Sequence, residues 1–192
     1  IHAARSANQP PLYDGHSIVT AETASTLFEN LVFDAIYAGA DKETKIVLLH
    51  NKISGDIATM QRQIAFFNCE LEIHNTIHSQ GAMTHDELKQ CMHKHLVSYL
   101  GTAVTIRPED GASYIYIPHL RYGFYVYTYT FGNLMSTIMA SHYKNNNSYR
   151  AKIDAFLSAG QSDTVANIFK SIGINTTRPD TFKEALKAHE KD

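Results

Sequence analysis

The sequence has little of what marks several common protein classes. Its 192 residues carry 17 Lys and Arg against 19 Asp and Glu, a formal net charge of −2. No basic excess therefore points to nucleic acid or to an anionic membrane surface. No apolar run is long enough to span a bilayer, and no stretch has the pattern of a signal peptide. These absences predict a globular chain with neither nucleic acid nor a membrane as its partner.

Cysteine is scarce as well. The two cysteines, Cys69 and Cys91, fall in helical patterns without the spacing that is typical of metal sites. They predict buried free thiols in a reducing compartment, which we take to be the cytoplasm. The chain also lacks an initiator Met, and its length fits one large domain or a piece of a larger one. A chain of this size can bury roughly 70% of its unfolded surface, so a sizeable core is expected.

Lys and Arg are absent between Arg5 and Lys42, and this stretch holds two acidic residues of interest. Apolar residues recur at helical spacing over residues 18–38, which predicts a helix. Glu22 and Glu29 lie two turns apart on one face of it. A carboxylate on an apolar face needs a partner, because burying an unpaired charge is expensive. The pattern leaves open a metal ion or a buried Arg or His, and by itself favours the structural pairing.

The rest of the chain is also predominantly helical in its pattern. Residues 102–122 contain Pro and Gly and predict a loop, with at most a short strand at 114–117. We therefore predict an all-α fold with little or no strand. No repeat or linker divides the chain, which predicts a single helical domain over residues 1–192. The further predicted helices cover residues 41–79 (kinked or split at Ser54-Gly55), 84–100 (with a Thr84–Glu87 capping box), 123–143, 148–159, 162–172 and 180–189.

Several histidines lie at positions with more than one interpretation. Glu70 and His74 share a helix face at i, i+4, which favours an ion pair over support of a metal site. The three histidines of the 84–100 helix lie among charged residues and are predicted to be solvated. These three are His85, His93 and His95.

Four segments, in order along the chain, resemble one family of peptidases. They are residues 2–11, the run Ala21 to Thr26 with Glu29 after it, Arg62-Gln63 to Glu70 and His74, and Pro118-His119 with the aromatic run Phe124 to Tyr129. On these motifs the chain resembles the C-terminal portion of the catalytic domain in the oligoendopeptidase F branch of the thimet-oligopeptidase family of zinc metallopeptidases.

The resemblance implies a zinc site that this sequence completes only in part. In the family an H-E-x-x-H helix supplies two His ligands and the general-base Glu, and a Glu on the next helix is the third ligand. Glu22 would be that ligand, and Glu29 would orient a ligand His. The H-E-x-x-H motif is absent here and would end just before Ile1. Because one Zn²⁺ needs about three protein ligands, the 192-residue chain alone is expected to hold zinc weakly or not at all and to be inactive.

The aromatic segment is implied to act on the substrate. His119 and Tyr125 would stabilise the tetrahedral intermediate by donating hydrogen bonds to its oxyanion. Tyr122 and Tyr129 would lie beside the substrate. The alternative for this segment is ordinary aromatic core packing.

The implied protein is a zinc-dependent oligopeptidase that hydrolyses short peptides. Its partner would be the missing N-terminal part of the same enzyme, and the chain should expose apolar surface where that part docks, with self-association as a consequence. One rival interpretation is a helical binding or scaffold module without catalysis. Another is a metal site built from the eleven His residues independently of the family.

Overall fold

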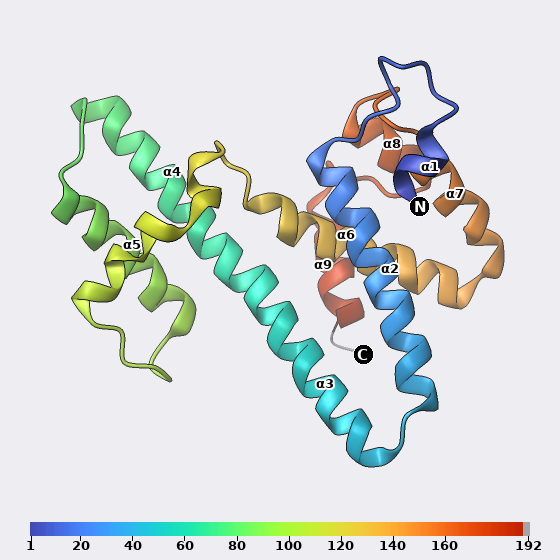
Figure 1. The fold of residues 1–192 in the computed structure, drawn as a ribbon, viewed down its shortest axis with the longest axis horizontal. Coiled ribbons are helices and arrows are strands. Elements are labelled where there is room, and N and C mark those ends of the chain that lie inside the picture. The colour runs from blue at the N-terminus through green and yellow to red at the C-terminus, as the bar shows by residue number, and fades with distance from the viewer. Residues whose placement is uncertain (190–192) are drawn as a thin grey trace. The chain divides into compact units, whose positions relative to one another are not determined.

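The computed structural model describes residues 1–189, and this part of the chain is helical without any strand (Figure 1). The predicted all-α fold is thereby confirmed. The chain divides into two compact units, which we describe separately. The first unit consists of residues 1–49 and the described residues from 131 on, and the second of residues 50–130. That both belong to a single domain stays a prediction.

The first unit is built around α2 and the greater part of α6. Helix α2 begins at Ile18 because the Ser17 side chain accepts the backbone N–H of Thr20, as an N-cap does. The largest fully buried side chains of this unit include Leu27, Phe156 and Phe169. The elements of this unit are α1 (His2–Ser6), α2 (Ile18–Gly39), the first half of α3 (Lys42–Ile57), α6 (Tyr127–Asn145) from residue 131 on, η4 (Asn147–Tyr149), α7 (Arg150–Ser158), α8 (Val165–Ser171) and α9 (Pro179–His189).

The second unit is an antiparallel helix pair with a 3₁₀-rich segment packed on it (Figure 1). The predicted capping box at the start of α5 is confirmed. The Thr84 side chain accepts the backbone N–H of Glu87, and the Glu87 side chain accepts the backbone N–H of Thr84. The core of this unit joins Phe66, Cys69, Cys91, Met92 and Val126. Its elements are the end of α3, the π-helical turn η1 (Ala58–Arg62), α4 (Gln63–Gln80), α5 (His85–Leu100), the 3₁₀ segments η2 (Pro108–Tyr116) and η3 (Pro118–Arg121), and the start of α6.

Several predicted boundaries were wrong, each for a local reason. The irregularity in the long second helix is a π-helical turn at Ala58–Arg62 and not a break at Ser54-Gly55. The short strand at 114–117 is instead 3₁₀ helix, which makes its hydrogen bonds locally and needs no partner strand. Helix α6 begins at Tyr127 and not at 123, because the residues before it have positive φ angles.

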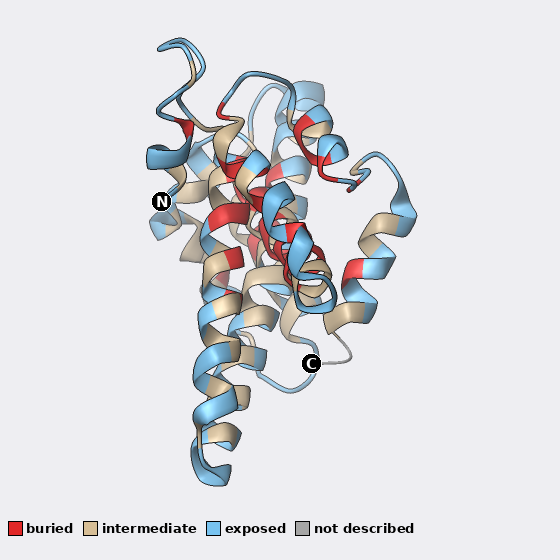
Figure 2. Ribbon diagram, turned by 90° about the vertical axis from the view of Figure 1, so that its right-hand side faces the viewer, coloured by how far each residue is buried: buried red, intermediate tan, exposed pale blue. Residues whose placement is uncertain are grey.

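The burial pattern leaves part of the first unit open. Buried residues stop short of the α2–α3 connection, where the chain is half-buried or exposed (Figure 2). Large apolar side chains on the ends of these helices are more than half exposed: Val32, Ile36, Ile46 and Val47. Apolar surface of this kind is what the sequence predicts for a chain whose docking partner is missing.

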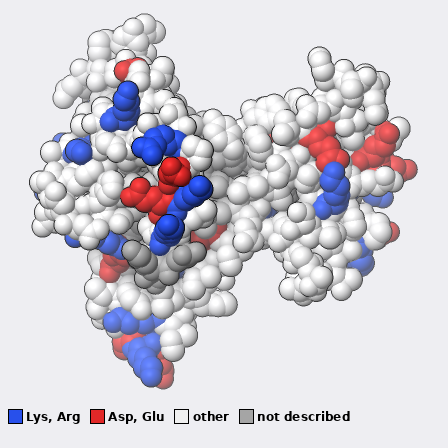
Figure 3. Space-filling model, turned by 180° about the vertical axis from the view of Figure 1, so that it is seen from behind, with Lys and Arg blue, Asp and Glu red and all other residues white. Residues whose placement is uncertain are grey.

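The charged side chains form no obvious single-sign field in the part of the chain that Figure 3 shows. Positive and negative groups lie beside one another on this face, and wide areas carry neither (Figure 3). Ion pairs of the first unit include Arg5–Asp154 and Lys144–Asp34. Among the described residues, no helix combines the length and apolarity that crossing a membrane requires.

Candidate active site

One part of the candidate site is a cluster of four side chains in the second unit. We define the His–Tyr cluster as His119, Tyr122, Tyr125 and Tyr129. The Tyr129 hydroxyl lies 3.1 Å from His119 Nε2 and 3.3 Å from the Tyr125 hydroxyl. The His119 and Tyr125 rings lie 5.4 Å apart between centroids, and those of Tyr122 and Tyr125 6.1 Å. The structure thus brings together all four residues that the sequence placed in the aromatic part of the site.

Hydrogen bonds join three members of the cluster, with Tyr129 between the other two. The Tyr129 hydroxyl lies within hydrogen-bond distance of both the Tyr125 oxygen and His119 Nε2. Because it has a single O–H, it donates to one of these neighbours and accepts from the other. Core packing alone does not account for this arrangement, because the cluster is only partly buried and Tyr122 is 67% exposed.

The loop that carries the cluster is held by a buried carboxylate. Gly123 and Phe124 have φ angles of +61° and +57°, and for Phe124 this left-handed conformation is strained. The Phe124 N–H donates to Glu70 Oε1 at 2.6 Å, and Glu70 is 2% exposed. The Phe124 ring packs on His74 with a centroid distance of 4.8 Å. Glu70 and its neighbours thus fix the backbone that immediately precedes Tyr125.

This contact changes the role expected of Glu70. The predicted ion pair with His74 is present only at 4.0 Å, and His74 is largely exposed. The shorter contact is with the Phe124 backbone, more than fifty residues away in sequence. No helical spacing pattern carries that information, so it was not predicted.

The predicted zinc ligand lies in the first unit, on α2. Glu22 is half-buried, and its backbone carbonyl accepts the Thr26 hydroxyl at 2.8 Å. Glu29, two turns later, is exposed. Gly132 of α6 comes so close that a Cβ on it would lie 3.0 Å from the Glu22 backbone carbon and 3.1 Å from its Cβ. The absence of a side chain at Gly132 is thus what lets α6 pack directly against the Glu22 turn.

Glu22 fits the role of one zinc ligand but cannot form a zinc site alone. A carboxylate oxygen on a half-buried helix face is an accepted zinc ligand. About three protein ligands are needed, so the others must come from residues outside this set. Glu22 and the His–Tyr cluster belong to the two units that are described separately, and their proximity stays a prediction.

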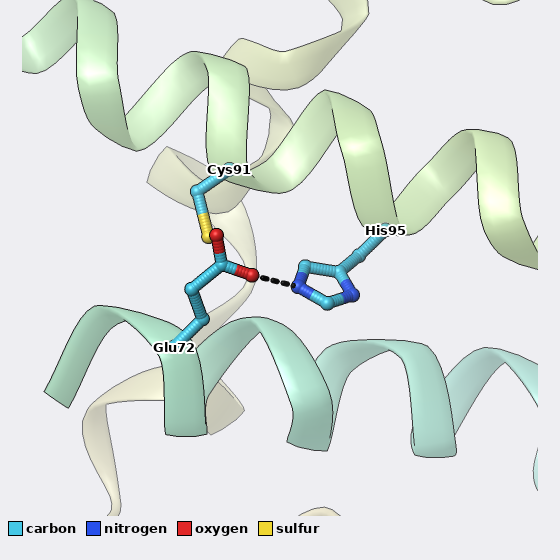
Figure 4. Close-up of side chains that lie close together, drawn as sticks. All are labelled: Glu72, Cys91 and His95. Atoms are coloured by element: carbon cyan, nitrogen blue, oxygen red, sulfur yellow. Dashed lines mark hydrogen bonds and ion pairs between the residues drawn. The ribbon is translucent and has the colours of Figure 1, made fainter. Parts of the chain in front are cut away.

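Sequence reasoning missed a second group of chemically active side chains. His95 was predicted to be solvated, but its side chain is 12% exposed and lies 2.8 Å from Glu72. Cys91 belongs to the same group (Figure 4). Cys69 and Cys91 are buried free thiols, as predicted. The spacing of four residues between Cys91 and His95 could have indicated this group in the sequence, because it places both side chains on one face of α5.

The chain belongs to Peptidase family M3, whose family model matches residues 1–188. The resemblance stated from the motifs is thereby confirmed. Among its relatives, the oligopeptidase PepF of Bacillus subtilis is 28% identical over 186 residues, which are 96% of this chain and 28% of the relative. The chromosomal oligoendopeptidase F of Lactococcus lactis subsp. cremoris is 27% identical over 187 residues, 96% of this chain and 31% of the relative. The chain thus spans less than a third of the length of these relatives.

Solved structures agree with the fold. A peptidase candidate from Chlamydophila abortus superposes with a TM-score of 0.86 at 27% identity, over 99% of this chain and 32% of that one. The oligoendopeptidase-F of Enterococcus faecium gives a TM-score of 0.77 at 24% identity, over 100% of this chain and 38% of the other. The second likeness bears on the fold alone.

Proposed function

We propose that this chain is the C-terminal part of a zinc-dependent oligopeptidase that hydrolyses short peptides. Membership of Peptidase family M3 supports peptide hydrolysis, and relatives more than three times as long support a further part of the enzyme. The observation that carries the assignment of roles is the hydrogen-bonded chain from His119 through Tyr129 to Tyr125. Buried free thiols suit a reducing cytoplasm.

In the proposed mechanism this chain contributes one zinc ligand and the oxyanion donors. Glu22 would provide the carboxylate ligand, and Glu29 would orient a ligand His from the other part of the enzyme. When bound, the zinc ion supplies Lewis-acid chemistry at the scissile carbonyl. Tyr125 and His119 would donate hydrogen bonds to the oxygen on which negative charge develops.

The remaining residues of the cluster position these donors and the substrate. Tyr129 bridges His119 and Tyr125 and fixes their spacing. A donor held in place before the reaction costs no reorganisation when the charge develops, which favours the transition state. Tyr122 is the most exposed member of the cluster and is available to a bound peptide.

The proposed partner is the part of the enzyme that carries H-E-x-x-H. The apolar side chains exposed on the ends of α2 and α3 are where it would dock: Val32, Ile36, Ile46 and Val47. Burying such side chains is favourable by about 1.5–3 kcal/mol each at full burial. Without this partner the same surface favours self-association of the chain.

The experiment is a peptidase assay on the enzyme reconstituted from this chain and the H-E-x-x-H part, with an internally quenched short peptide. The chain alone should show no activity. Tyr125→Phe should lower kcat by about 10²–10³-fold, as the loss of one oxyanion donor does, with a smaller effect on KM. Tyr116→Phe is the matched control, because Tyr116 is 75% exposed and outside the cluster.

Two results would contradict the proposal. Activity of the 192-residue chain by itself would show that the zinc site is not the one proposed. Equal kcat values for Tyr125→Phe and Tyr116→Phe would remove Tyr125 from the oxyanion site and favour the aromatic packing role.

A further inference from the structure

A second group of potential metal ligands lies between α4 and α5, within the second unit. Glu72 of α4 and Cys91 and His95 of α5 each offer one ligand atom, and these three atoms all lie within 4.8 Å of one another. Figure 4 shows the three side chains converging from the two facing helices. All three belong to one compact unit, and none of them is a residue of the proposed peptidase site.

The spacing on each helix suits chelation. Cys91 and His95 are four apart on α5, and Cys69 and Glu72 are three apart on α4, so each helix presents two donors on one face. Cys69 Sγ lies 3.7 Å from Cys91 Sγ. Two thiolates at a Zn–S distance of about 2.3 Å in a tetrahedron are about 3.8 Å apart. The two sulfur atoms thus have the separation of zinc ligands, but Cys69 is not part of the group whose ligand atoms all lie within 4.8 Å of one another.

The contacts of Glu72 also suit a cation. Its Oε2 accepts a hydrogen bond from Lys94 and lies 2.8 Å from His95 Nε2, so the carboxylate already faces positively charged or proton-donating groups. A thiol binds a metal ion as the thiolate, so binding at Cys91 would release its proton.

The exposure of these side chains indicates how a metal ion could reach the group and which residue would compete with it. Cys91 and Cys69 are buried, whereas the Glu72 side chain is 37% exposed and also lines a surface hollow of about 340 Å³ on α4. Glu72 is therefore the most exposed of the three ligands and the one that an ion would meet first. Lys94 forms an ion pair with Glu72 and has a 62% exposed side chain, so it can swing into solvent. Lys94 is a cation that an incoming metal ion would displace.

We propose that Glu72, Cys91 and His95 form a zinc site that ties α4 to α5. Mixed sulfur and imidazole ligands select zinc over calcium or magnesium, and three protein ligands with one water complete a tetrahedral zinc site. The site is independent of the proposed peptidase function. It also changes one expectation from the sequence, since the chain alone would now bind one zinc ion.

The experiment measures metal binding to the 192-residue chain with a thiol-free reductant present. Co²⁺ is the spectroscopic probe, because thiolate coordination gives charge-transfer absorption that carboxylates and imidazoles do not. Zn²⁺ should displace Co²⁺ at one equivalent per chain and raise Tm. Cys91→Ser and His95→Gln should each weaken binding by more than about 10–100-fold, the loss caused even by outer partners of metal ligands.

Two further variants make the result specific. Lys94→Gln should bind zinc more tightly than the wild type, because it removes the competing cation but no ligand. Glu22→Ala should bind as the wild type does, since Glu22 belongs to the proposed peptidase site. Folding of each variant is checked by far-UV circular dichroism without metal.

The proposal is overturned by any of three results. One is the absence of thiolate-to-cobalt absorption in the folded wild-type chain. Another is loss of binding in Glu22→Ala together with retention in Cys91→Ser, which would place the metal at the peptidase site. The third is a Cys69–Cys91 disulfide as the sole chemistry of the pair, seen as a mass decrease on oxidation without metal binding under reduction.

Discussion

Replacing Gly132 by Ala tests the packing of α6 against the Glu22 turn. The new Cβ would lie 3.0 Å from the Glu22 backbone carbon and 3.1 Å from the Thr23 backbone nitrogen. Both are backbone atoms of a helix and cannot rotate away, so α2 or α6 must shift. Overpacking of this kind costs about 1–3 kcal/mol. Ala is favoured over Gly in a helix interior by about 1 kcal/mol, which offsets part of that cost.

Gly55→Ala is the matched control, because it makes the same change inside α3 with no atom within 4 Å of the new Cβ. The helix preference cancels between the two variants, so the difference in their free energies of unfolding isolates the overpacking. We expect Gly132→Ala to be less stable than Gly55→Ala by about 1–3 kcal/mol. The assay is urea unfolding followed by far-UV circular dichroism, where a slope of about 2 kcal/mol/M converts this into a midpoint difference of about 0.5–1.5 M.

The outcome also bears on the candidate zinc ligand. A shift of α2 relative to α6 moves Glu22, so the reconstituted peptidase should lose activity in Gly132→Ala and keep it in Gly55→Ala. If Gly132→Ala is as stable as Gly55→Ala, the close approach of the two helices does not exist as described. The argument that Gly132 positions Glu22 would then be refuted.

Two further predictions concern buried polar and titratable groups. Glu70→Ala leaves the Phe124 N–H without its acceptor and should lower the free energy of unfolding by about 1–3 kcal/mol, with faster amide exchange at Phe124; unchanged exchange there would show that Glu70 does not hold the loop. The pKa of His2 is lowered from 6.5 to about 4, first by burial and then by His16, so between these pH values the unfolded chain binds more protons than the folded one. Stability should therefore fall as the pH drops from 6.5 to 4, and His2→Gln should flatten this dependence in urea midpoints measured across the range. Equal slopes in the two proteins would contradict the assignment.

The sequence was sufficient where the controlling interactions are local. The Thr84–Glu87 capping box starts its helix as predicted, because the cap depends on residues within three positions. The start of α6 was predicted too early, because the left-handed Phe124 depends on its hydrogen bond to Glu70, far away in sequence. Propensity alone cannot anticipate a contact that is formed only in the folded chain.

The two groups of candidate site residues show the same difference between contacts local in sequence and contacts formed only on folding. The spacing of His119, Tyr125 and Tyr129 was visible in the sequence, and the structure joins them by hydrogen bonds. The group of Glu72, Cys91 and His95 draws on two helices that face each other only after folding. Glu72 lies on a different helix from Cys91 and His95, so no short sequence motif contains all three residues.

The central claim is that Glu22 is the carboxylate ligand of the peptidase zinc. Its most direct test is the zinc content of the reconstituted peptidase after dialysis, measured in a Cys91→Ser background so that the α4–α5 site does not contribute. We expect one zinc per enzyme with Glu22 in place, nearly one in Glu29→Ala, and far less than one in Glu22→Ala, since two His ligands remain where about three ligands are needed. A full zinc complement in Glu22→Ala would contradict the account.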